Sequence, residues 1–483
     1  MTRQTRRRTI VFTPFTRVEG NLQLKVEVAD GVVVSARASG TLFRGFEEMV
    51  RGQQPTTAIV YLCRICGQCG AAHSSASAQA IGDAFAVSPP PNGIQARAII
   101  QAVEMVLSHL GHFYLSLAAD LCGLPGGARF EEAYAPVRGT AFQKALRARR
   151  VMLGLMGLFA GKWPNTLAIQ PGGVTRAVGR SELIRAKGIL AEFRRSLEQE
   201  LLHCPVERWL ANRSMSDVER WLGEAEHQDS DLGRFIALAL QAGLQRIGKG
   251  PGRFLSSGGF LLPGGKTWLQ PGYYEAGVHP FDHSKLVEDV AFSWFEEDGA
   301  AKHPSDGSAV PSHDKPQAYS WVKAPRYAGK SVEVGPMARM VVDGDPLATD
   351  IMSLHGASVF ARVLLRLHEA VRLVKDLDAW LGQINPEAPY CVRHQSRTPA
   401  TGAALVEAPR GLLGHWIQIE QERIRNYQII TPTGFNLSPC DGEGQPGPLE
   451  EALVGTPVED PDKAVNIALV VRSYDPCLYC SVH

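Results

Sequence analysis

The chain has 483 residues, of which 45% are hydrophobic and 20% are charged. This is the composition of a folded globular protein, and it excludes a disordered, collagen-like or coiled-coil chain. Fifty lysines and arginines nearly cancel 49 aspartates and glutamates, so no overall basic charge is present to hold nucleic acid or an anionic membrane surface.

The N-terminus does not have the pattern of a secretory signal. Four arginines within the first eight residues lead into an alternating segment, where a signal peptide would have an apolar stretch. The longest apolar runs, such as Ile467 to Val471, are far shorter than the roughly 20 residues that cross a bilayer. We therefore expect no membrane span and a location that is cytoplasmic or membrane-associated through partner subunits. Export would need a signal on a partner.

Two segments near the N-terminus alternate apolar and polar side chains. They cover residues 9–12 and 22–28, and the sequence Ala29-Asp30-Gly31 indicates a turn before Val32-Val33-Val34. Such alternation bounded by a turn is typical of strands that have one buried face. The pattern predicts a small antiparallel sheet.

Most of the remaining chain shows helical periodicity. Apolar residues recur at helical spacing over 92–122, where Gly123 and Pro125 end the predicted helix. Further helices are predicted over 140–161, 182–202, 231–243 and 349–381. Residues 297–317 and 438–462 are rich in proline and glycine and are predicted to be surface loops, and residues 415–430 are predicted to form a β-hairpin. The expected fold is mainly α with peripheral β (α+β), a single large domain over residues 1–483 with small antiparallel sheets.

The nine cysteines are too few for a disulfide scaffold in a chain of this length. Their positions carry more information than their number. Five lie in two short segments, one near each end of the chain: Cys63, Cys66, Cys69, Cys477 and Cys480. The other four are isolated and are predicted to be buried small hydrophobic residues: Cys122, Cys204, Cys391 and Cys440.

Two C-x-x-C pairs, Cys66/Cys69 and Cys477/Cys480, are separated by roughly 400 residues. Zinc fingers place their pairs about 12 to 20 residues apart, so this spacing argues against a finger. Each pair alone could be a zinc half-site, a redox couple or chance. A histidine close to each pair, His73 and His483, favours one shared metal site. Sulfur ligands favour nickel, copper(I), zinc or iron over magnesium or calcium.

Six segments resemble, in order, the signature motifs of the nickel-iron hydrogenase large subunit. They are Arg17-Val18-Glu19-Gly20, Phe43-Arg44-Gly45-Phe46-Glu47, Arg64-Ile65-Cys66-Gly67-Gln68-Cys69 with His73, Glu333-Val334-Gly335-Pro336, Ala408-Pro409-Arg410-Gly411, and the last nine residues, from Asp475 to His483. The resemblance extends from residue 16 to the last residue. Two positions depart from the family pattern. Asn165 follows Gly161-Lys162-Trp163-Pro164 where members often have histidine, and Gln68 stands where many members have a small or aliphatic residue.

The resemblance implies a binuclear metal site with one role for each thiolate. Cys66 and Cys477 would bind nickel terminally, and Cys69 and Cys480 would bridge nickel to an iron that carries cyanide and carbon monoxide. Such a centre has surplus negative charge, so a fixed cation is expected beside it.

Arg410 is similar to the family's active-site arginine and would supply that cation without titrating. Asp120 and Asp475 resemble the carboxylates around this arginine. Capping of a helix or a turn is the alternative role for both.

Dihydrogen is a very weak acid, so its heterolytic cleavage needs a metal and a nearby base. The candidate bases are a nickel-bound thiolate, Cys477, and Arg410. Glu19 resembles the carboxylate that passes the proton onward, and an exposed charge at a strand end is the alternative.

The resemblance also implies a second, magnesium-like ion, with Glu47, the backbone carbonyl near Ile429 and His483 as its ligands. The chain stops at this histidine, either because a longer precursor was trimmed or because the gene ends there. His73 would be a hydrogen-bond donor near Cys69, although a core histidine is the commoner role for such a residue.

The leading hypothesis is the catalytic large subunit of a nickel-iron hydrogenase, which cleaves H2 reversibly and serves hydrogen uptake. Because the sequence offers no cysteine cluster for an electron relay, an iron-sulfur small subunit is expected as partner, in a heterodimer and a higher oligomer of heterodimers. A hydrogen-sensing regulatory subunit, a non-catalytic structural subunit of a respiratory complex and a zinc-stabilised interaction module are the alternatives. The respiratory relatives lose the cysteine pairs, which this chain retains.

Overall fold

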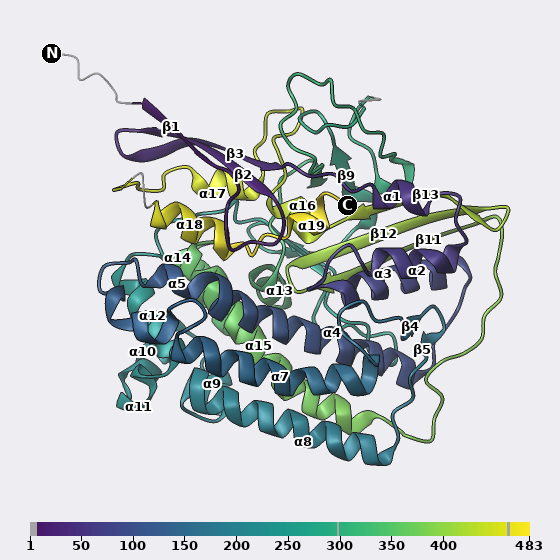
Figure 1. The fold of residues 1–483 in the computed structure, drawn as a ribbon, viewed down its shortest axis with the longest axis horizontal. Helices are drawn as coiled ribbons and strands as arrows, with labels where there is room; N and C mark the ends of the chain where they lie inside the picture. The colour runs from purple at the N-terminus through teal and green to yellow at the C-terminus, as the bar shows by residue number, and fades with distance from the viewer. Residues whose placement is uncertain (1–6, 297–298, 461–463) are drawn as a thin grey trace.

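The computed structural model describes residues 7–296, 299–460 and 464–483. Four long helices lie together in the lower part of Figure 1: α4 (Pro91–Gly111), α7 (Thr140–Ala160), α8 (Arg180–Ser196) and α15 (Val359–Gln383). Helix α4 packs against both α7 and α15, and α8 packs against α7 and α15. Nearly every residue of α4 is buried, including polar ones such as Gln95, Arg97 and Glu104.

The predicted helices over 140–161, 182–202 and 231–243 are confirmed by α7, by α8 with a π-helical turn (Leu197–Leu202), and by α12 (Asp231–Gln241). The segment 92–122 is helical throughout, but a π-helical turn (His112–Leu117) separates α4 from α5 (Ala118–Leu121).

The prediction of one continuous helix over 349–381 was wrong. The structure has α14 (Pro346–His355) and then α15, because Gly356 between them adopts a φ of 57°. This left-handed conformation ends a helix readily at glycine. The Ser358 hydroxyl accepts a hydrogen bond from the Ala361 N–H and so caps the new helix.

The predicted N-terminal sheet is confirmed. Strands β1 (Arg7–Phe12), β2 (Leu22–Ala29) and β3 (Val32–Gly40) are antiparallel in the order β1-β2-β3. Alternate residues of β2 are buried, as the period of two requires.

The predicted hairpin is also present, as β12 (Gly411–Glu420) and β13 (Arg423–Ile430), but it belongs to a three-stranded sheet. The additional strand, β11 (Ala400–Ala408), was not predicted because its small residues lack alternation. A Cβ on its Gly402 would lie 2.2 Å from the Ala80 carbonyl oxygen of α3 (Gly70–Ala84), so glycine permits this close packing.

The loop prediction for 438–462 was wrong in part, because it contains α17 (Pro448–Leu453), and residues 461–463 lie outside the described residues. In the 297–317 segment, residues 297–298 lie outside the description and a 3-10 turn (Pro304–Asp306) interrupts an otherwise irregular course. The remaining elements are α1 (Phe46–Val50), α2 (Pro55–Leu62), α6 (Glu131–Tyr134), α9 (Val206–Leu210), α10 (Met215–Gly223), α11 (Ala225–Gln228), α13 (Pro336–Asp343), α16 (Pro432–Asn436), α18 (Val465–Ser473), α19 (Leu478–Ser481), β4 (Ile169–Gln170), β5 (Gly173–Val174), β6 (Phe254–Ser256), β7 (Gly272–Tyr274), β8 (Val278–His279), β9 (Leu286–Asp289) and β10 (Ala324–Tyr327), together with 3-10 turns at Gly127–Phe130 and His283–Lys285.

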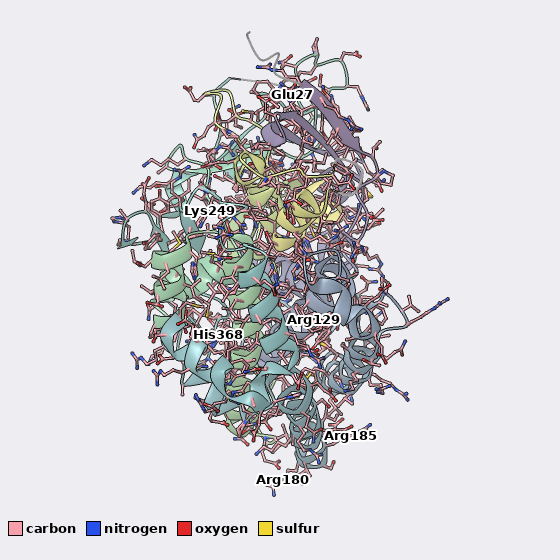
Figure 2. All side chains as sticks on the ribbon, turned by 90° about the vertical axis from the view of Figure 1, so that its left-hand side faces the viewer. Glu27, Arg129, Arg180, Arg185, Lys249 and His368 are labelled. Carbon is pink, nitrogen blue, oxygen red and sulfur yellow. The ribbon has the colours of Figure 1, made fainter. Side chains whose placement is uncertain are left out.

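The four long helices and the N-terminal sheet occupy opposite parts of the molecule (Figure 1), and the predicted α+β class is confirmed. Figure 2 shows Glu27 of the N-terminal sheet at one end and Arg180 and Arg185 of α8 at the other. The C-terminal helix α19 lies between them, close to α16 (Figure 1). No helix in the part of the chain that the structure describes has the length and apolar character needed to span a membrane.

Candidate metal centre

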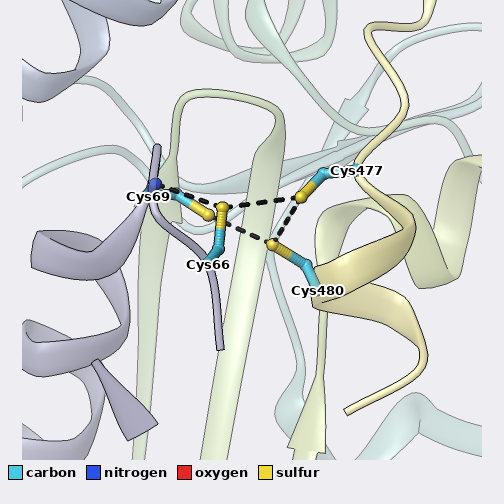
Figure 3. Close-up of side chains that lie close together, drawn as sticks. All are labelled: Cys66, Cys69, Cys477 and Cys480. Atoms are coloured by element: carbon cyan, nitrogen blue, oxygen red, sulfur yellow. Dashed lines mark hydrogen bonds between the residues drawn. The ribbon is translucent and has the colours of Figure 1, made fainter. Parts of the chain in front are cut away.

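The two C-x-x-C pairs meet at one buried place (Figure 3). The four sulfur atoms lie within 4.8 Å of one another, and all nine cysteines of the chain are free. The Sγ atom of Cys480 is 3.0 Å from that of Cys477 and 3.1 Å from that of Cys69, and the Sγ atoms of Cys66 and Cys477 are 3.5 Å apart. Four soft ligands converging out of water are suited to a transition metal.

The other cysteines lie apart from this cluster. Cys63 is buried and is not among the four sulfurs. The prediction that the isolated cysteines are buried was wrong, because Cys122, Cys204, Cys391 and Cys440 are each partly exposed.

The first pair is held by the turn that precedes α3. The backbone N–H groups of Gln68 and Cys69 donate to the Cys66 sulfur at 3.3 and 3.4 Å. Helix α3 begins directly after Cys69. The fully buried carboxylate of Glu104, on α4, accepts hydrogen bonds from the first turn of α3, at Ala71 N and Ala72 N (both 2.9 Å), which fixes this turn against the core.

Glu104 is a positioning residue that the sequence analysis missed. Its carboxylate also accepts a hydrogen bond from the Trp163 indole at 3.0 Å, and burial raises the pKa of Glu104 to about 7. We expect Glu104→Gln to lower the free energy of unfolding by about 1–3 kcal/mol, because an amide NH2 would face buried N–H donors. Thermal or denaturant unfolding of the purified protein measures this loss. The exposed Glu132→Gln is the matched control, and equal stability of the two variants would contradict the assignment.

The second pair is held by the N-terminal motif. The Leu478 N–H donates to the Glu19 carbonyl at 2.7 Å, and the Glu19 N–H donates to the Pro476 carbonyl at 3.2 Å. Gly20 has a φ of 86°, and a Cβ there would lie 2.9 Å from the Tyr479 nitrogen. Glycine therefore permits the close approach of the two chain segments. The Cys477 N–H donates to the Thr433 hydroxyl at 3.0 Å.

Arg44 connects both cysteine segments, which its motif alone did not indicate. Its guanidinium donates to the Ile65 carbonyl beside the first pair, and to the Tyr479 carbonyl within the second pair at 2.8 Å. Its backbone N–H donates to the Val482 carbonyl at 3.1 Å.

The close approach of the thiols and their burial shift the pKa values of Cys66, Cys69 and Cys480. Hydrogen bonding with Cys477 lowers the pKa of Cys66 well below the usual thiol value and raises the pKa of Cys69 well above it. Burial raises the pKa of Cys480 well above that value. Metal binding at this cluster would therefore release protons.

Arg410 lies buried close to the thiols of the cluster. Its Nε donates to the Asp475 carbonyl at 2.7 Å, and Nη2 donates to the Asp475 carboxylate at 3.0 Å. Burial opposes the charge of Arg410, but Asp475 and the thiolates raise its pKa well above the usual value. Nη1 has no hydrogen-bond partner among the described residues, so this buried cation has a free donor for an anionic group.

The two predicted aspartates differ in position. Asp475 contacts Arg410 and also Arg366 at 3.2 Å. Although burial raises its pKa, these guanidinium groups hold the pKa of Asp475 below the usual value. Within the described residues, Asp120 pairs instead with Arg17 and Arg472 and makes no hydrogen bond to Arg410.

Glu19 faces a cavity of about 280 Å³ that Gln68, Arg410 and Asp475 also line. Its carboxylate is half-buried and accepts a hydrogen bond from the Gln68 amide. Burial raises the pKa of Glu19 above its usual value, which is the direction that favours proton uptake by this carboxylate.

The ring of His73, which was predicted to be a hydrogen-bond donor near Cys69, pairs with another histidine. Its Nδ1 lies 3.2 Å from His415 Nε2, and His415 Nδ1 lies 2.9 Å from the Tyr427 hydroxyl. Among the described residues, the hydrogen bond between His73 and Cys69 is a backbone one, in which the His73 N–H donates to the Cys69 carbonyl oxygen at 3.2 Å. Burial lowers the pKa of His73 to about 3, so the ring is neutral. The sequence analysis missed His415, which stands at the start of the predicted hairpin.

The residues predicted for the second ion also meet. Glu47 Oε1 accepts the Ile429 N–H at 2.7 Å and lies 3.4 Å from His483 Nε2. The Lys323 ammonium lies 3.4 Å from Glu47 and 3.3 Å from Glu288. Burial opposes ionisation of Glu47, but Lys323 and His483 hold its pKa below the usual value. Lys323 and Glu288 belong to no motif recognised in the sequence and were not predicted.

The comparisons with known proteins agree with this arrangement. A family model described as nickel-dependent hydrogenase matches residues 44–125 and 139–483. The chain is 33% identical to the periplasmic [NiFeSe] hydrogenase large subunit of Desulfomicrobium baculatum, with 98% of this chain and 94% of that protein covered. It is 28% identical to the hydrogenase-2 large chain of Escherichia coli (strain K12), covering 98% and 97%.

Among solved structures, an H2-activated [NiFeSe]-hydrogenase of Dm. baculatum matches with a TM-score of 0.86 and 31% identity, over 99% of this chain and 100% of that chain. The names of this structure and of the Desulfomicrobium relative include selenium. The chain described here has cysteine at all four positions of the cluster.

Proposed function

This chain belongs to the nickel-dependent hydrogenase family, and from that premise we propose that it is the catalytic large subunit of a nickel-iron hydrogenase. Its reaction is the reversible heterolytic cleavage of H2 into protons and electrons, in the direction of hydrogen uptake. The observation that carries the proposal is the buried cluster of four thiols from the two ends of the chain, with a fixed guanidinium beside it.

The residues at the cluster fit a binuclear metal group. Cys66 and Cys477 would hold nickel terminally, and Cys69 and Cys480 would bridge it to iron that carries cyanide and carbon monoxide. The free Nη1 donor of Arg410 supports this fit, since an anionic ligand there would satisfy a buried donor that otherwise has no partner. When bound, the group supplies the Lewis-acid and redox chemistry that dihydrogen cleavage needs.

The chain's own residues would move the proton. The Cys477 thiolate and Arg410 are the candidate bases, and Asp475 fixes the guanidinium through two hydrogen bonds. Glu19 is bonded through its backbone to the residues on both sides of Cys477, and its carboxylate faces the cavity. This position suits a group that accepts a proton near the sulfurs and releases it away from them. Asp120 would act away from the cluster, through its ion pairs with Arg17 and Arg472.

Glu47, His483 and the backbone of Ile429 would hold a magnesium ion. An extended strand residue presents its N–H and C=O on the same edge, so the Ile429 carbonyl faces the side on which its N–H contacts Glu47. Two carboxylates, Glu47 and Glu288, outweigh the single Lys323 ammonium, which leaves negative charge for a hard cation. His73 would support the cluster through the backbone of the first cysteine pair.

An iron-sulfur small subunit would take up the electrons, in a heterodimer and in a higher oligomer of heterodimers. Among the described residues, the four cysteines of the cluster are the group that lies close enough together to hold a metal. The other five cysteines lie apart from this group, which supports an electron relay on another chain. The whole of residues 1–483 would form one catalytic domain. It would work in the cytoplasm or at a membrane through partner subunits.

Metal analysis with infrared spectroscopy tests the proposal. We expect nickel and iron in about equal amounts, together with infrared bands of cyanide and carbon monoxide. Stoichiometric zinc without nickel and without these bands would contradict it.

A further inference from the structure

Gln68 joins the two groups to which the proposed function assigns the proton. Its side-chain N–H donates to the Glu19 carboxylate, and its side-chain oxygen accepts from Arg410 Nη2 at 3.4 Å. The residue lies inside the first cysteine motif, where its backbone N–H also bonds to Cys66. The same side chain lines the cavity beside Glu19.

Glutamine suits this position because it is both a donor and an acceptor. Arg410 offers only donors and an ionised Glu19 only acceptors, so the amide can face both groups in one orientation only. An aliphatic side chain at this position would make neither bond. A glutamate would present a second carboxylate to Glu19.

The Glu19 carboxylate depends on this amide for its orientation. Among the described residues its side chain has Gln68 as its hydrogen-bond partner and no other, and it borders a cavity of about 280 Å³ into which it could turn. Loss of the amide would therefore free the carboxylate while leaving the four cysteines and the Arg410–Asp475 pair in place.

We propose that Gln68 is a positioning residue for proton transfer, which holds the Glu19 carboxylate in a fixed relation to Arg410. This inference rests on the proposed function. It concerns the step in which the proton leaves the cluster, and it predicts no change in metal binding or in cleavage of dihydrogen itself.

The test replaces Gln68 in the purified holoenzyme. Gln68→Met keeps the length of the side chain without its hydrogen bonds, and Gln68→Val introduces the type of side chain that many family members carry. The control is Gln418→Met, since Gln418 is a half-buried glutamine on β12 whose amide, within the described part of the chain, donates only to the Ser305 carbonyl, at 2.7 Å.

We expect both Gln68 variants to exchange deuterium with water tenfold to a hundredfold more slowly than the parent, the order of magnitude of a misplaced reacting group. Conversion between ortho- and para-hydrogen, metal content and the cyanide and carbon monoxide bands should not change. The infrared band of the Glu19 carboxyl, identified by its loss in Glu19→Gln, should shift. In a Glu19→Gln background the Gln68 variants should cause no further loss of exchange.

Exchange at the parental rate with an unshifted Glu19 band in Gln68→Val would overturn the inference. So would an equal further loss in the Glu19→Gln background, because Gln68 would then act independently of Glu19. If Gln68→Met fails to load metal, Gln68→Val decides. If the parent protein itself lacks nickel and the diatomic bands, the proposed function fails, and this outcome is distinct from an unaltered Gln68 variant of an active enzyme.

Discussion

Glu19→Gln should lower the exchange of deuterium with solvent protons by about 10²–10⁴-fold, the usual contribution of a general acid–base group. Glutamine keeps the size of the side chain but cannot be protonated to a neutral acid and back. Hydrogen oxidation should fall with exchange, because the proton released at the cluster has no onward acceptor. Both rates are measured on the metal-loaded enzyme, by mass spectrometry of the gas and by dye reduction.

Conversion between ortho- and para-hydrogen is the internal control of this experiment, since it requires only cleavage and recombination at the metal site. It should survive in Glu19→Gln. The backbone bonds of residue 19 to Pro476 and Leu478 do not involve its side chain, so the cysteines should keep their positions. Exchange at the parental rate would make Glu19 a structural carboxylate, and the proton would then have to leave by another route, for example past Arg410.

Arg410→Lys should lower turnover by about 10²-fold or more, the usual cost of removing one preorganised donor, while the metals stay bound. The guanidinium makes two hydrogen bonds to Asp475 and one to Gln68, and still has a free donor. An ammonium cannot reproduce this planar fork, and burial favours the loss of its proton. Hydrogen oxidation and metal content measured on the same preparation test this expectation.

The exposed Arg180→Lys, on α8, is the matched control and should keep full activity. Its side chain pairs only at the surface, with Glu387, where both groups are mostly exposed. Unchanged hydrogen oxidation in a fully metallated Arg410→Lys variant would remove Arg410 from the mechanism.

Local sequence patterns were sufficient for much of the fold. The alternation in 22–28 and the turn at Asp30-Gly31 determine the N-terminal sheet, since one buried face requires a period of two. The apolar periodicity of 140–161 determines α7, since a helix with one buried face requires apolar residues at helical spacing. The break at Gly356 is a local feature, a glycine with a positive φ, and it was missed because the apolar periodicity was followed across it. The strand β11 was missed because its small residues are placed by tertiary packing against α3.

The candidate site was likewise predictable from the sequence in part, and its remaining features depend on the tertiary structure. The sequence alone marks the two C-x-x-C pairs as soft metal ligands, and the resemblance of their flanking motifs to the nickel-iron hydrogenase large subunit implies the chemistry. That Cys66 and Cys477 lie 3.5 Å apart, although 411 positions separate them, is decided by Glu19, Gly20 and Arg44, whose backbone and side-chain contacts hold the two ends together.

Only the tertiary structure decided which polar groups pair at the site. It placed His415 against His73, Arg17 and Arg472 against Asp120, and Lys323 beside Glu47. It also placed the Gln68 side chain between Glu19 and Arg410, where it hydrogen-bonds to both. The sequence marks Gln68 only as a departure from the family pattern. Partners at such sequence distances follow from the packing of whole elements and the directions of side chains in space, and a local pattern of residue types contains neither.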